Sequence, residues 1–266
     1  SVYAFWNKSG QSQPIPSAAF GSEDVWTGHP LVAHLNESAN TTAGGYKNSS
    51  GGADGTGVSM SLAGQDLPYG AVSSRFAGTP DEIIFGITTL QKETTFDFWA
   101  KVDSTGSDQR ALSAGIAPDT GAATRTFLVW ADAGANNDGW ASFIRNAAGD
   151  NIAGGNIGGT NNDVSTSVFQ KISVYASNTR LEIFVDGVST AVGTYSDSTA
   201  LDITNYISIG RAFLNTGSSN YFSGGIGGVK AYSGDGRDKL ASEYNNQYNP
   251  STFWTAGAVF VPGGGT

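Results

Sequence analysis

The sequence predicts an all-β fold, a jelly-roll sandwich of two antiparallel sheets with a short C-terminal helix. Charged residues make up only 14% of the 266 residues and glycine accounts for 37 of them, a composition that favours strands and turns over surface helices. Many short segments alternate apolar and polar residues, and no helical period separates them before residue 238. Such a series of short strands is typical of two packed antiparallel sheets rather than a parallel α/β layer.

The clearest predicted strands lie in residues 170–193, "QKISVYASNTRLEIFVDGVSTAVG". Three alternating runs are joined there by a short loop and by Asp186-Gly187, which favours a type I′ hairpin because glycine accepts positive φ. Residues 94–102, "TTFDFWAKV", place phenylalanines on one face and polar residues with a tryptophan on the other, so only one face is expected in the core. Further strands are predicted at residues 31–36, 58–63, 81–86, 125–131, 139–146, 205–210 and 222–232.

One short helix is predicted from Asp238 to Gln247. Its apolar and aromatic residues recur every four positions and form one stripe. We expect Asp235 to cap its start and Pro250 to stop it, because the residue before proline is pushed out of α geometry. The helix would lie on the sandwich and close an open sheet edge, which protects that strand from pairing with other chains. The stripe consists of Leu240, Tyr244 and Tyr248.

The strands are expected to form one domain, because no linker in mid-chain divides them and no repeat of fixed period is present. We expect residues 1–30 to be an N-terminal segment that packs on the sandwich and residues 31–256 to be the sandwich itself. Residues 257–266 are expected to be a flexible glycine-rich tail. Because the chain begins with Ser1 rather than methionine, we expect a processed product or a piece of a longer protein.

The composition argues against several classes of partner and chemistry. The formal net charge of −9 disfavours nucleic acid, whose phosphates require a basic surface. The absence of cysteine excludes disulfides and thiol chemistry. No apolar run approaches the roughly 18 residues of a membrane span, so membrane insertion is not expected.

Several motifs resemble those of a known superfamily. Residues 207–254, "ISIGRAFLNTGSSNYFSGGIGGVKAYSGDGRDKLASEYNNQYNPSTFW", are similar to the closing section of laminin-G-like jelly-roll modules of the concanavalin-A-like lectin and glucanase superfamily. The motifs "TFDFWAKV" and "LEIFVDG" occur upstream in the order of those modules. The beginning, with "VYAFWNKSGQSQP", "DVW" and "VAHLNE", resembles a small module that commonly precedes them, although Ala33 stands where tryptophan is usual.

This resemblance implies a binding or structural role, because such modules occur in bacterial surface and secreted proteins and in phage tail and virion proteins. An enzyme of this superfamily would be a glycosidase or polysaccharide lyase. Retaining glycosidases need two carboxylates about 5 Å apart, and inverting ones roughly 6.5 to 9.5 Å. The nearest candidates, Glu182 and Asp186, lie four residues apart on one strand face, which is about 13 Å at about 3.3 Å per residue. We therefore predict no catalytic residues and no enzyme activity.

The segment "ADAGANNDGW", residues 131–140, is the best candidate for an ion site. Asp132, Asn136 and Asp138 place hard oxygen donors, which Ca²⁺ prefers, in a glycine-bearing turn. The same residue types make ordinary hairpin loops, so a plain turn is the alternative. A structural calcium ion is the one cofactor that the sequence suggests.

A sugar site requires an exposed aromatic ring beside amide or carboxylate groups. Trp140 has such neighbours in the same loop, and Tyr221 has them in "NTGSSNYF"; either ring could instead pack in the core or at a sheet edge. His34 is expected to be buried and hydrogen-bonded rather than a ligand. The candidate ligand-binding residues are Trp140, Asn136, Asn137, Asn220 and Tyr221.

Two functions fit these observations. In the first, the chain is a non-catalytic recognition or adhesion module that binds glycans, as part of a phage virion or a bacterial surface protein. In the second, it is a structural or assembly domain of a virion protein whose partners are protein subunits, with a homo-oligomer as one form. We favour the first, and expect a location at the virion surface, outside the cell or at the cell surface.

Overall fold

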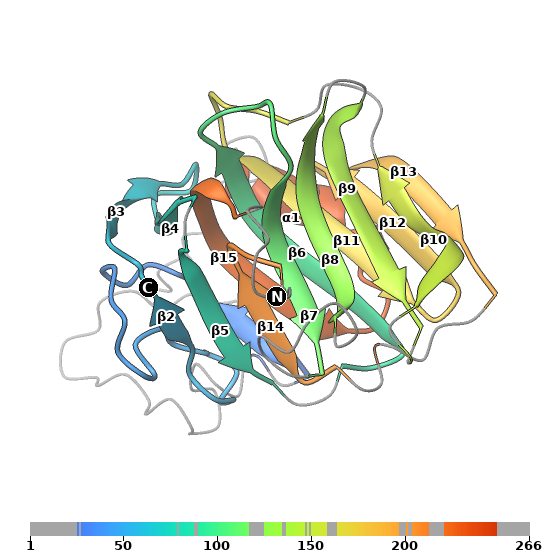
Figure 1. Ribbon diagram of the computed structural model, residues 1–266, viewed down its shortest axis with the longest axis horizontal. Helices are drawn as coiled ribbons and strands as arrows, with labels where there is room; N and C mark the ends of the chain where they lie inside the picture. The colour runs from blue at the N-terminus through green and yellow to red at the C-terminus, as the bar shows by residue number, and fades with distance from the viewer. Residues whose placement is uncertain are drawn as a thin grey trace, which may run out of the picture.

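The computed structural model shows a sandwich of two antiparallel sheets, with one helix among the described residues (Figure 1). This confirms the predicted fold class. The structure describes residues 26, 28–78, 80–87, 90–116, 125–134, 137–146, 148, 150–158, 164–196, 201, 204–212 and 221–248. Within these ranges the side chains of residues 125, 133, 134, 137, 138, 151 and 153 are not described.

The two sheets form two layers, with the seven-stranded sheet toward the viewer in Figure 1 and the eight-stranded sheet behind it. The seven-stranded sheet has the order β10 (Asn151–Gly158), β9 (Asn137–Arg145), β8 (Arg125–Gly134), β7 (Gln109–Gly115), β14 (Tyr206–Ile209), β5 (Glu82–Gly86) and β2 (Thr56–Val58). The eight-stranded sheet has the order β13 (Val188–Thr194), β12 (Arg180–Val185), β11 (Gln170–Ser177), β6 (Glu93–Val102), β15 (Ser223–Ser233), β4 (Val72–Ala77) and β3 (Leu62–Asp66), and β1 (Leu31–Ala33) also pairs with β15.

The inner faces of the two sheets enclose one main hydrophobic core. Phe96 and Phe98 of β6 point into it from one sheet and meet Phe127 of β8 and Trp140 of β9 from the other. Phe96 stacks on Phe127 with ring centroids 4.4 Å apart, and Phe98 meets Trp140 edge-on at 6.2 Å. Burying one such aromatic side chain stabilises the fold by about 1.5–3 kcal/mol, so these rings hold the two layers together.

The predicted hairpin at Asp186-Gly187 joins β12 to β13. Asp186 has φ of 53° and Gly187 has φ of 79°, so both central residues are left-handed, as a type I′ turn requires. A Cβ atom on Gly187 would lie 2.8 Å from the backbone of Ala241 in the helix. Glycine is therefore needed there both for its conformation and for the close approach of the helix.

The helix α1 (Arg237–Tyr248) lies on the outer face of the eight-stranded sheet, not at a sheet edge as the sequence suggested. Leu240 is fully buried against Tyr175 of β11 and Phe184 of β12. The rest of the predicted stripe is less buried: Tyr244 is half-buried, and Tyr248 is 49% exposed. The helix is thus most deeply buried near its start, at Leu240, while its second half contacts Trp99 of β6 through the Tyr244 ring and the Gln247 side chain.

The start of α1 is fixed by Asp235, as predicted, since its carboxylate accepts a hydrogen bond of 3.1 Å from the backbone N–H of Arg237. Asp235 stands two residues before Arg237, so the contact lies just outside the first turn. The Arg237 guanidinium stacks over the Tyr175 ring at 4.4 Å and pairs with Glu182 at 3.0 Å. The N-terminal end of the helix is therefore held on β11 and β12.

A buried ionic cluster of Asp97, Lys171, Lys230 and Glu243 lies between α1 and the sheet. The Asp97 carboxylate lies 3.3 Å from Lys171 Nζ and 3.2 Å from Lys230 Nζ, and Glu243 of α1 pairs with both lysines. Asp97 and Lys171 are each 1% exposed. Because buried charges are tolerated only when paired, this cluster connects the helix to β6, β11 and β15.

The predicted N-terminal segment, residues 1–30, and tail, residues 257–266, lie outside the described residues except for Trp26 and residues 28–30. Within the described part of the chain, no helix is long and apolar enough to cross a membrane. The prediction that His34 is buried is wrong, because its side chain is exposed. The strand β1 ends at Ala33, and the chain turns at Leu35, which has φ of 57°.

Candidate functional site

The outer face of the seven-stranded sheet carries a row of stacked aromatic and guanidinium groups across three adjacent strands. Arg110 of β7 lies over the ring of Trp130 of β8 at 4.9 Å, and Trp130 meets Phe143 of β9 at 5.8 Å. Arg145, two residues further along β9, lies over the Phe143 ring at 5.2 Å. These four side chains are called the arginine–aromatic row below.

Strand alternation explains why these side chains share a face. In β8, Phe127 and Val129 belong to the main core, so Trp130 and Asp132 point outward. The register pairs Trp130 of β8 with Ala141 of β9, so both point outward. The next outward residue of β9 is Phe143. The antiparallel pairing of β7, β8 and β9 therefore builds the row from three strands that are consecutive in the chain.

The guanidinium groups of this face are paired with carboxylates. Arg110 donates to Asp108 at 3.2 Å, and Arg211 pairs with Glu82 at 3.2 Å. Burial lowers the pKa of Arg110, while the nearby charges of Asp108 and Asp132 oppose that shift. The described residues of this face therefore offer both hydrogen-bond donors and acceptors, and their positive and negative charges are paired.

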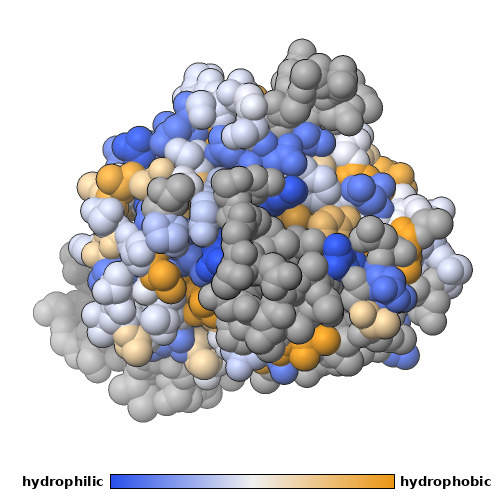
Figure 2. All heavy atoms as spheres, viewed as in Figure 1, coloured by the Kyte–Doolittle hydropathy of each residue, from blue (hydrophilic) through white to orange (hydrophobic). Residues whose placement is uncertain are grey.

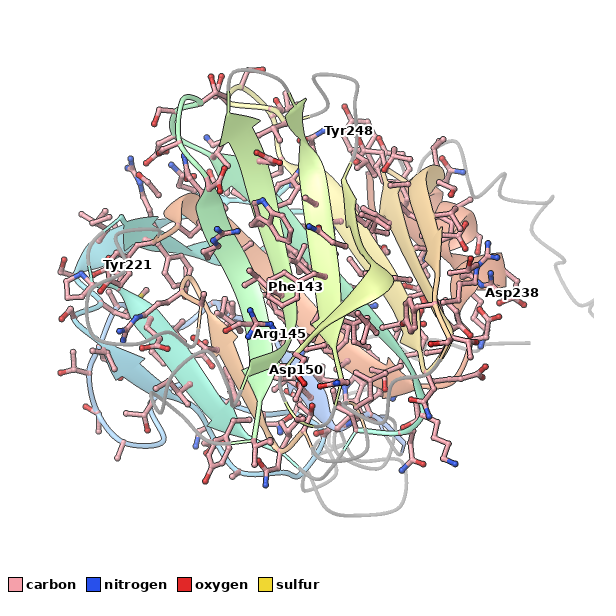
Figure 3. The ribbon with its side chains drawn as sticks, turned by 45° about the vertical axis from the view of Figure 1, so that its right-hand side comes forward. Phe143, Arg145, Asp150, Tyr221, Asp238 and Tyr248 are labelled. Atoms are coloured by element: carbon pink, nitrogen blue, oxygen red, sulfur yellow. The ribbon has the colours of Figure 1, made fainter. Side chains whose placement is uncertain are left out.

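Guanidinium groups also lie beside aromatic rings and near carboxylates at the two ends of the row. At Arg145, burial lowers the pKa of the guanidinium and the charge of Asp150 opposes the shift. Figure 3 shows Phe143, Arg145 and Asp150 close together on the sheet and Tyr221 toward its other side. The Arg211 guanidinium lies 5.4 Å from the centre of the Tyr221 ring. Each aromatic group here thus has a guanidinium beside it.

The face is partly apolar and has a shallow hollow at one end. Phe143 lines a space of about 110 Å³ together with Ile152 of β10 and Asn156. Trp130 is 7% exposed, whereas Phe143 is half-buried and so has accessible ring surface. Figure 2 shows hydrophobic and hydrophilic residues interspersed among the described residues that are visible on this side of the molecule.

Trp140, the aromatic ring expected to be exposed, lies in the core. It is 0% exposed, meets Phe98 edge-on, and places its indole Nε1 3.3 Å from Gln170 Oε1, to which it donates. The register places Trp140 opposite Ala131, so it occupies an inward position next to the outward pair of Trp130 and Ala141. A ring without exposed surface cannot stack on a sugar, which favours the alternative that Trp140 packs in the core.

The other predicted site residues are only partly described. Asp132 lies at the outer face near Arg110, and Tyr221 is half-buried beside Arg211. Asn136 and Asn220 lie outside the described residues, as do the side chains of Asn137 and Asp138. Among the described side chains, no three of His, Asp and Glu come together as metal ligands. The calcium site at Asp132, Asn136 and Asp138 stays a prediction.

The four residues of the row, Arg110, Trp130, Phe143 and Arg145, are not among the site residues predicted from the sequence. The signal was present in the alternation of "FLVWAD", residues 127–132, and "WASFIR", residues 140–145. Each run places its residues on two faces, and the face that carries the charged residue, Asp132 or Arg145, is the outer one.

The carboxylate pair considered for catalysis is held in other interactions. Glu182 accepts hydrogen bonds from Ser189 at 2.8 Å, from Arg180 at 2.9 Å and from Arg237 at 3.0 Å. Burial would raise the pKa of Glu182, but these hydrogen bonds outweigh it and hold the pKa below its ordinary value. A general acid of a glycosidase must stay protonated near neutral pH, so Glu182 is poorly suited to that role. Asp186 forms the hairpin turn and accepts from the Lys171 backbone at 2.8 Å.

Known structures with a similar fold include binding domains of bacterial toxins. The binding domain of Paraclostridial mosquitocidal protein 1 has a TM-score of 0.59 at 10% identity, over 85% of this chain and 53% of that one. The botulinum neurotoxin serotype D ligand-binding domain in complex with N-acetylneuraminic acid has a TM-score of 0.58 at 8% identity, over 83% and 51%. The receptor-binding domain of botulinum neurotoxin C/D mosaic serotype has 0.58 at 9% identity, over 84% and 52%.

This chain spans about half the length of those domains, and at such identities the likeness establishes a shared fold. No curated protein is significantly similar to the chain in sequence. A family model of the laminin-G type, described as the concanavalin A-like lectin/glucanases superfamily, matches residues 77–235. The match covers more than half of the chain, from the last residue of β4 to two residues before α1, and so the chain belongs to the concanavalin A-like lectin/glucanase superfamily.

Proposed function

We propose that this chain is a non-catalytic recognition module that binds neutral glycans on the outer face of the seven-stranded sheet. The observation that carries the proposal is the arginine–aromatic row, in which two rings and two guanidinium groups are held side by side across β7, β8 and β9. Cation–π contacts are worth about 0.5–1 kcal/mol each at exposed sites, and they bias these side chains toward the arrangement that a ligand would meet.

The chemistry of the row suits uncharged sugars. The C–H faces of a pyranose pack on aromatic surface, and its hydroxyl groups both donate and accept hydrogen bonds. Arg110 beside Asp108 and Arg145 near Asp150 offer both kinds of partner. Because each guanidinium has a carboxylate nearby, the described residues of this face carry no excess of positive charge that would select a polyanion.

The setting that we propose is the surface of a phage virion or of a bacterial cell, or a secreted protein. The motif resemblance and the fold shared with binding domains of toxins support this setting. We further propose that residues 1–30 pack on the sandwich as a separate segment and that residues 257–266 form a flexible tail. A calcium ion at the Asp132 to Asp138 loop would order that end of the binding face.

A second candidate function, assembly with protein subunits, is favoured by the edge strand β13. Val188 is 66% exposed and Val192 is 49% exposed on this strand, which is terminal in the eight-stranded sheet. An edge strand with exposed apolar residues is a surface on which another strand can pair or pack. In this alternative the partner is a protein, and a homo-oligomer is the simplest form.

A glycan array probed with the labelled chain distinguishes the two functions. We expect saturable binding to a subset of neutral oligosaccharides, a monomer in sedimentation, and no release of reducing ends from the same panel. An oligomer that Val188→Asp disrupts, together with no neutral glycan bound, would establish the assembly function instead. Reducing-end release that a single Asp or Glu substitution abolishes would show an enzyme.

A further inference from the structure

The opposite side of the molecule has a small pocket on the outer face of the eight-stranded sheet. It measures about 160 Å³ and is lined by side chains from β1, β6, β15, α1, the β3–β4 loop and the segment before β1. We call it the β15 pocket. Its lining includes the side chains of Trp26, Tyr69, Trp99, Lys230 and Gln247.

The pocket lies where β15 stops pairing with β4 and starts pairing with β1 along the same edge of the strand. Ile226 pairs with Ser74 of β4, whereas Val229 pairs with Ala33 of β1. The pairing of β15 with β6 is shifted between Gly227 and Lys230, which marks a bulge. Bulges are common beside binding sites because they redirect side chains locally.

Two residues at this position have left-handed backbones. Gly228 has φ of 59°, and Leu35, two residues after β1, has φ of 57°. The Gly228 N–H donates to the His34 carbonyl at 3.1 Å and so ties the two turns together. A non-glycine residue at positive φ costs about 1–3 kcal/mol and is found mainly where surrounding structure imposes it, often at functional sites.

The walls of the pocket are aromatic and ordered. Tyr69 and Trp99 have ring centroids 5.9 Å apart, and the Trp99 indole Nε1 donates to Gln247 Oε1 at 2.9 Å. Burial raises the pKa of Tyr69 to about 12, so its hydroxyl stays protonated and can donate a hydrogen bond. A Cβ on Gly228 would lie 2.7 Å from the Tyr69 hydroxyl, so glycine is what leaves room there.

The polar groups of the pocket are mainly donors. The Lys230 ammonium contacts Asp97 at 3.2 Å and Glu243 at 3.1 Å, and an ammonium group has three N–H donors. Gln247 uses its amide oxygen on Trp99, which leaves its NH₂ group as the part that can serve a ligand. Together with the Tyr69 hydroxyl, these groups favour a ligand that presents hydrogen-bond acceptors. Asp97 and Glu243 balance the charge of Lys230, so the preference for a carboxylate rests on its oxygens being the strongest acceptors for these donors rather than on a net positive charge.

The size of the pocket limits the ligand to one ring. Drug-sized ligands occupy about 300–1,000 Å³, so about 160 Å³ admits a single small unit rather than an oligosaccharide. We propose that the β15 pocket binds an acidic monosaccharide unit, with the sugar ring against Tyr69 and Trp26 and the carboxylate directed to Lys230 and Gln247. This site is separate from the arginine–aromatic row and does not depend on it.

Binding of D-glucuronate and of D-glucose to the full chain, followed by NMR through the tryptophan indole N–H signals, tests the proposal. Trp26 and Trp99 line the pocket, so their signals should shift with glucuronate. We expect glucose to bind about tenfold more weakly, because it lacks the carboxylate. Equal affinity for the two sugars, or no shift of either indole signal, overturns the proposal.

Two tyrosine variants locate the binding. Tyr69→Ala should weaken glucuronate binding by about tenfold, since it removes the exposed ring of the pocket. Tyr248→Ala is the matched control, because Tyr248 is also a partly exposed ring on this side but lies outside the pocket. Unchanged binding by Tyr69→Ala, with melting confirming that it is folded, contradicts the assignment, as does an equal loss in both variants. The array tests neutral-glycan binding at the arginine–aromatic row, and the tyrosine variants test glucuronate binding at the β15 pocket. A negative result in one experiment therefore leaves the other proposal standing.

Discussion

Replacing Asp97 by asparagine tests whether the buried ionic cluster holds α1 on the sheet. The carboxylate lies within 3.3 Å of Lys171 Nζ and accepts a hydrogen bond of 2.8 Å from the Ser173 hydroxyl. Asparagine keeps the shape but removes the charge, which leaves two ammonium groups with Glu243 as the remaining carboxylate of the cluster. Removing one partner of a buried ion pair costs about 3–5 kcal/mol.

Thermal and denaturant unfolding measure this loss. In a domain of about 150–250 residues, 1 kcal/mol shifts the melting temperature by about 2–4 °C, so we expect a fall of roughly 6–20 °C. Asp103→Asn is the matched control, because Asp103 pairs with Arg75 at 3.1 Å on the surface. That substitution should cost less than about 1 kcal/mol, since exposed ion pairs contribute little.

The dependence on pH gives a second check on Asp97. Burial would raise its pKa, but the charges of Lys171 and Lys230 outweigh this and hold the pKa below its ordinary value. A carboxylate with a lowered pKa in the folded state stabilises the protein above its unfolded pKa of about 3.9, and this contribution is lost as the pH falls through the folded value. The difference between the wild type and Asp97→Asn should therefore be constant near neutral pH and narrow below about pH 4. Equal stability at pH 7, or a difference that widens in acid, would refute the reasoning.

Two further predictions concern the helix and the loop. Leu240→Ala should lower the free energy of unfolding by about 2–5 kcal/mol, because Leu240 is fully buried. Tyr248→Ala should lower it by less than about 1 kcal/mol, because Tyr248 is largely exposed. A larger loss of stability for Tyr248→Ala in thermal melting would mean that the end of α1 is packed. Calcium should raise the melting temperature of the wild type but not of Asp132→Ala/Asp138→Ala. If the double variant keeps the shift, the ion binds elsewhere.

Much of the fold could be predicted because its signals are local. The Asp186-Gly187 turn depends on two left-handed residues, and the placement of Phe96 and Phe98 depends only on strand alternation. The position of α1 could not be predicted in the same way. A stripe at helical spacing indicates which side of a helix is apolar, but it does not show whether that side packs on a sheet face or a sheet edge.

The candidate site was harder to predict, because exposure depends on which strand faces meet the core. Trp130 and Trp140 have similar sequence surroundings, yet the register places Trp140 opposite Ala131 and turns it inward. Trp130 is then on the outer face beside Arg110, a contact between β7 and β8 that no sequence spacing encodes. His34 is exposed for a related reason, since alternation places Leu31, Ala33 and Leu35 in the core and turns His34 to the opposite face.

The most direct test of the proposed function is calorimetric titration of Phe143→Ala and Arg145→Ala with a neutral oligosaccharide that binds the wild type. Both side chains belong to the arginine–aromatic row, and Phe143 supplies its accessible ring surface. We expect each substitution to weaken binding by about tenfold while melting stays near that of the wild type. Tyr248→Ala, on the opposite side of the sandwich, should bind as the wild type does. Unchanged affinity in Phe143→Ala and Arg145→Ala would contradict the assignment of glycan binding to this face.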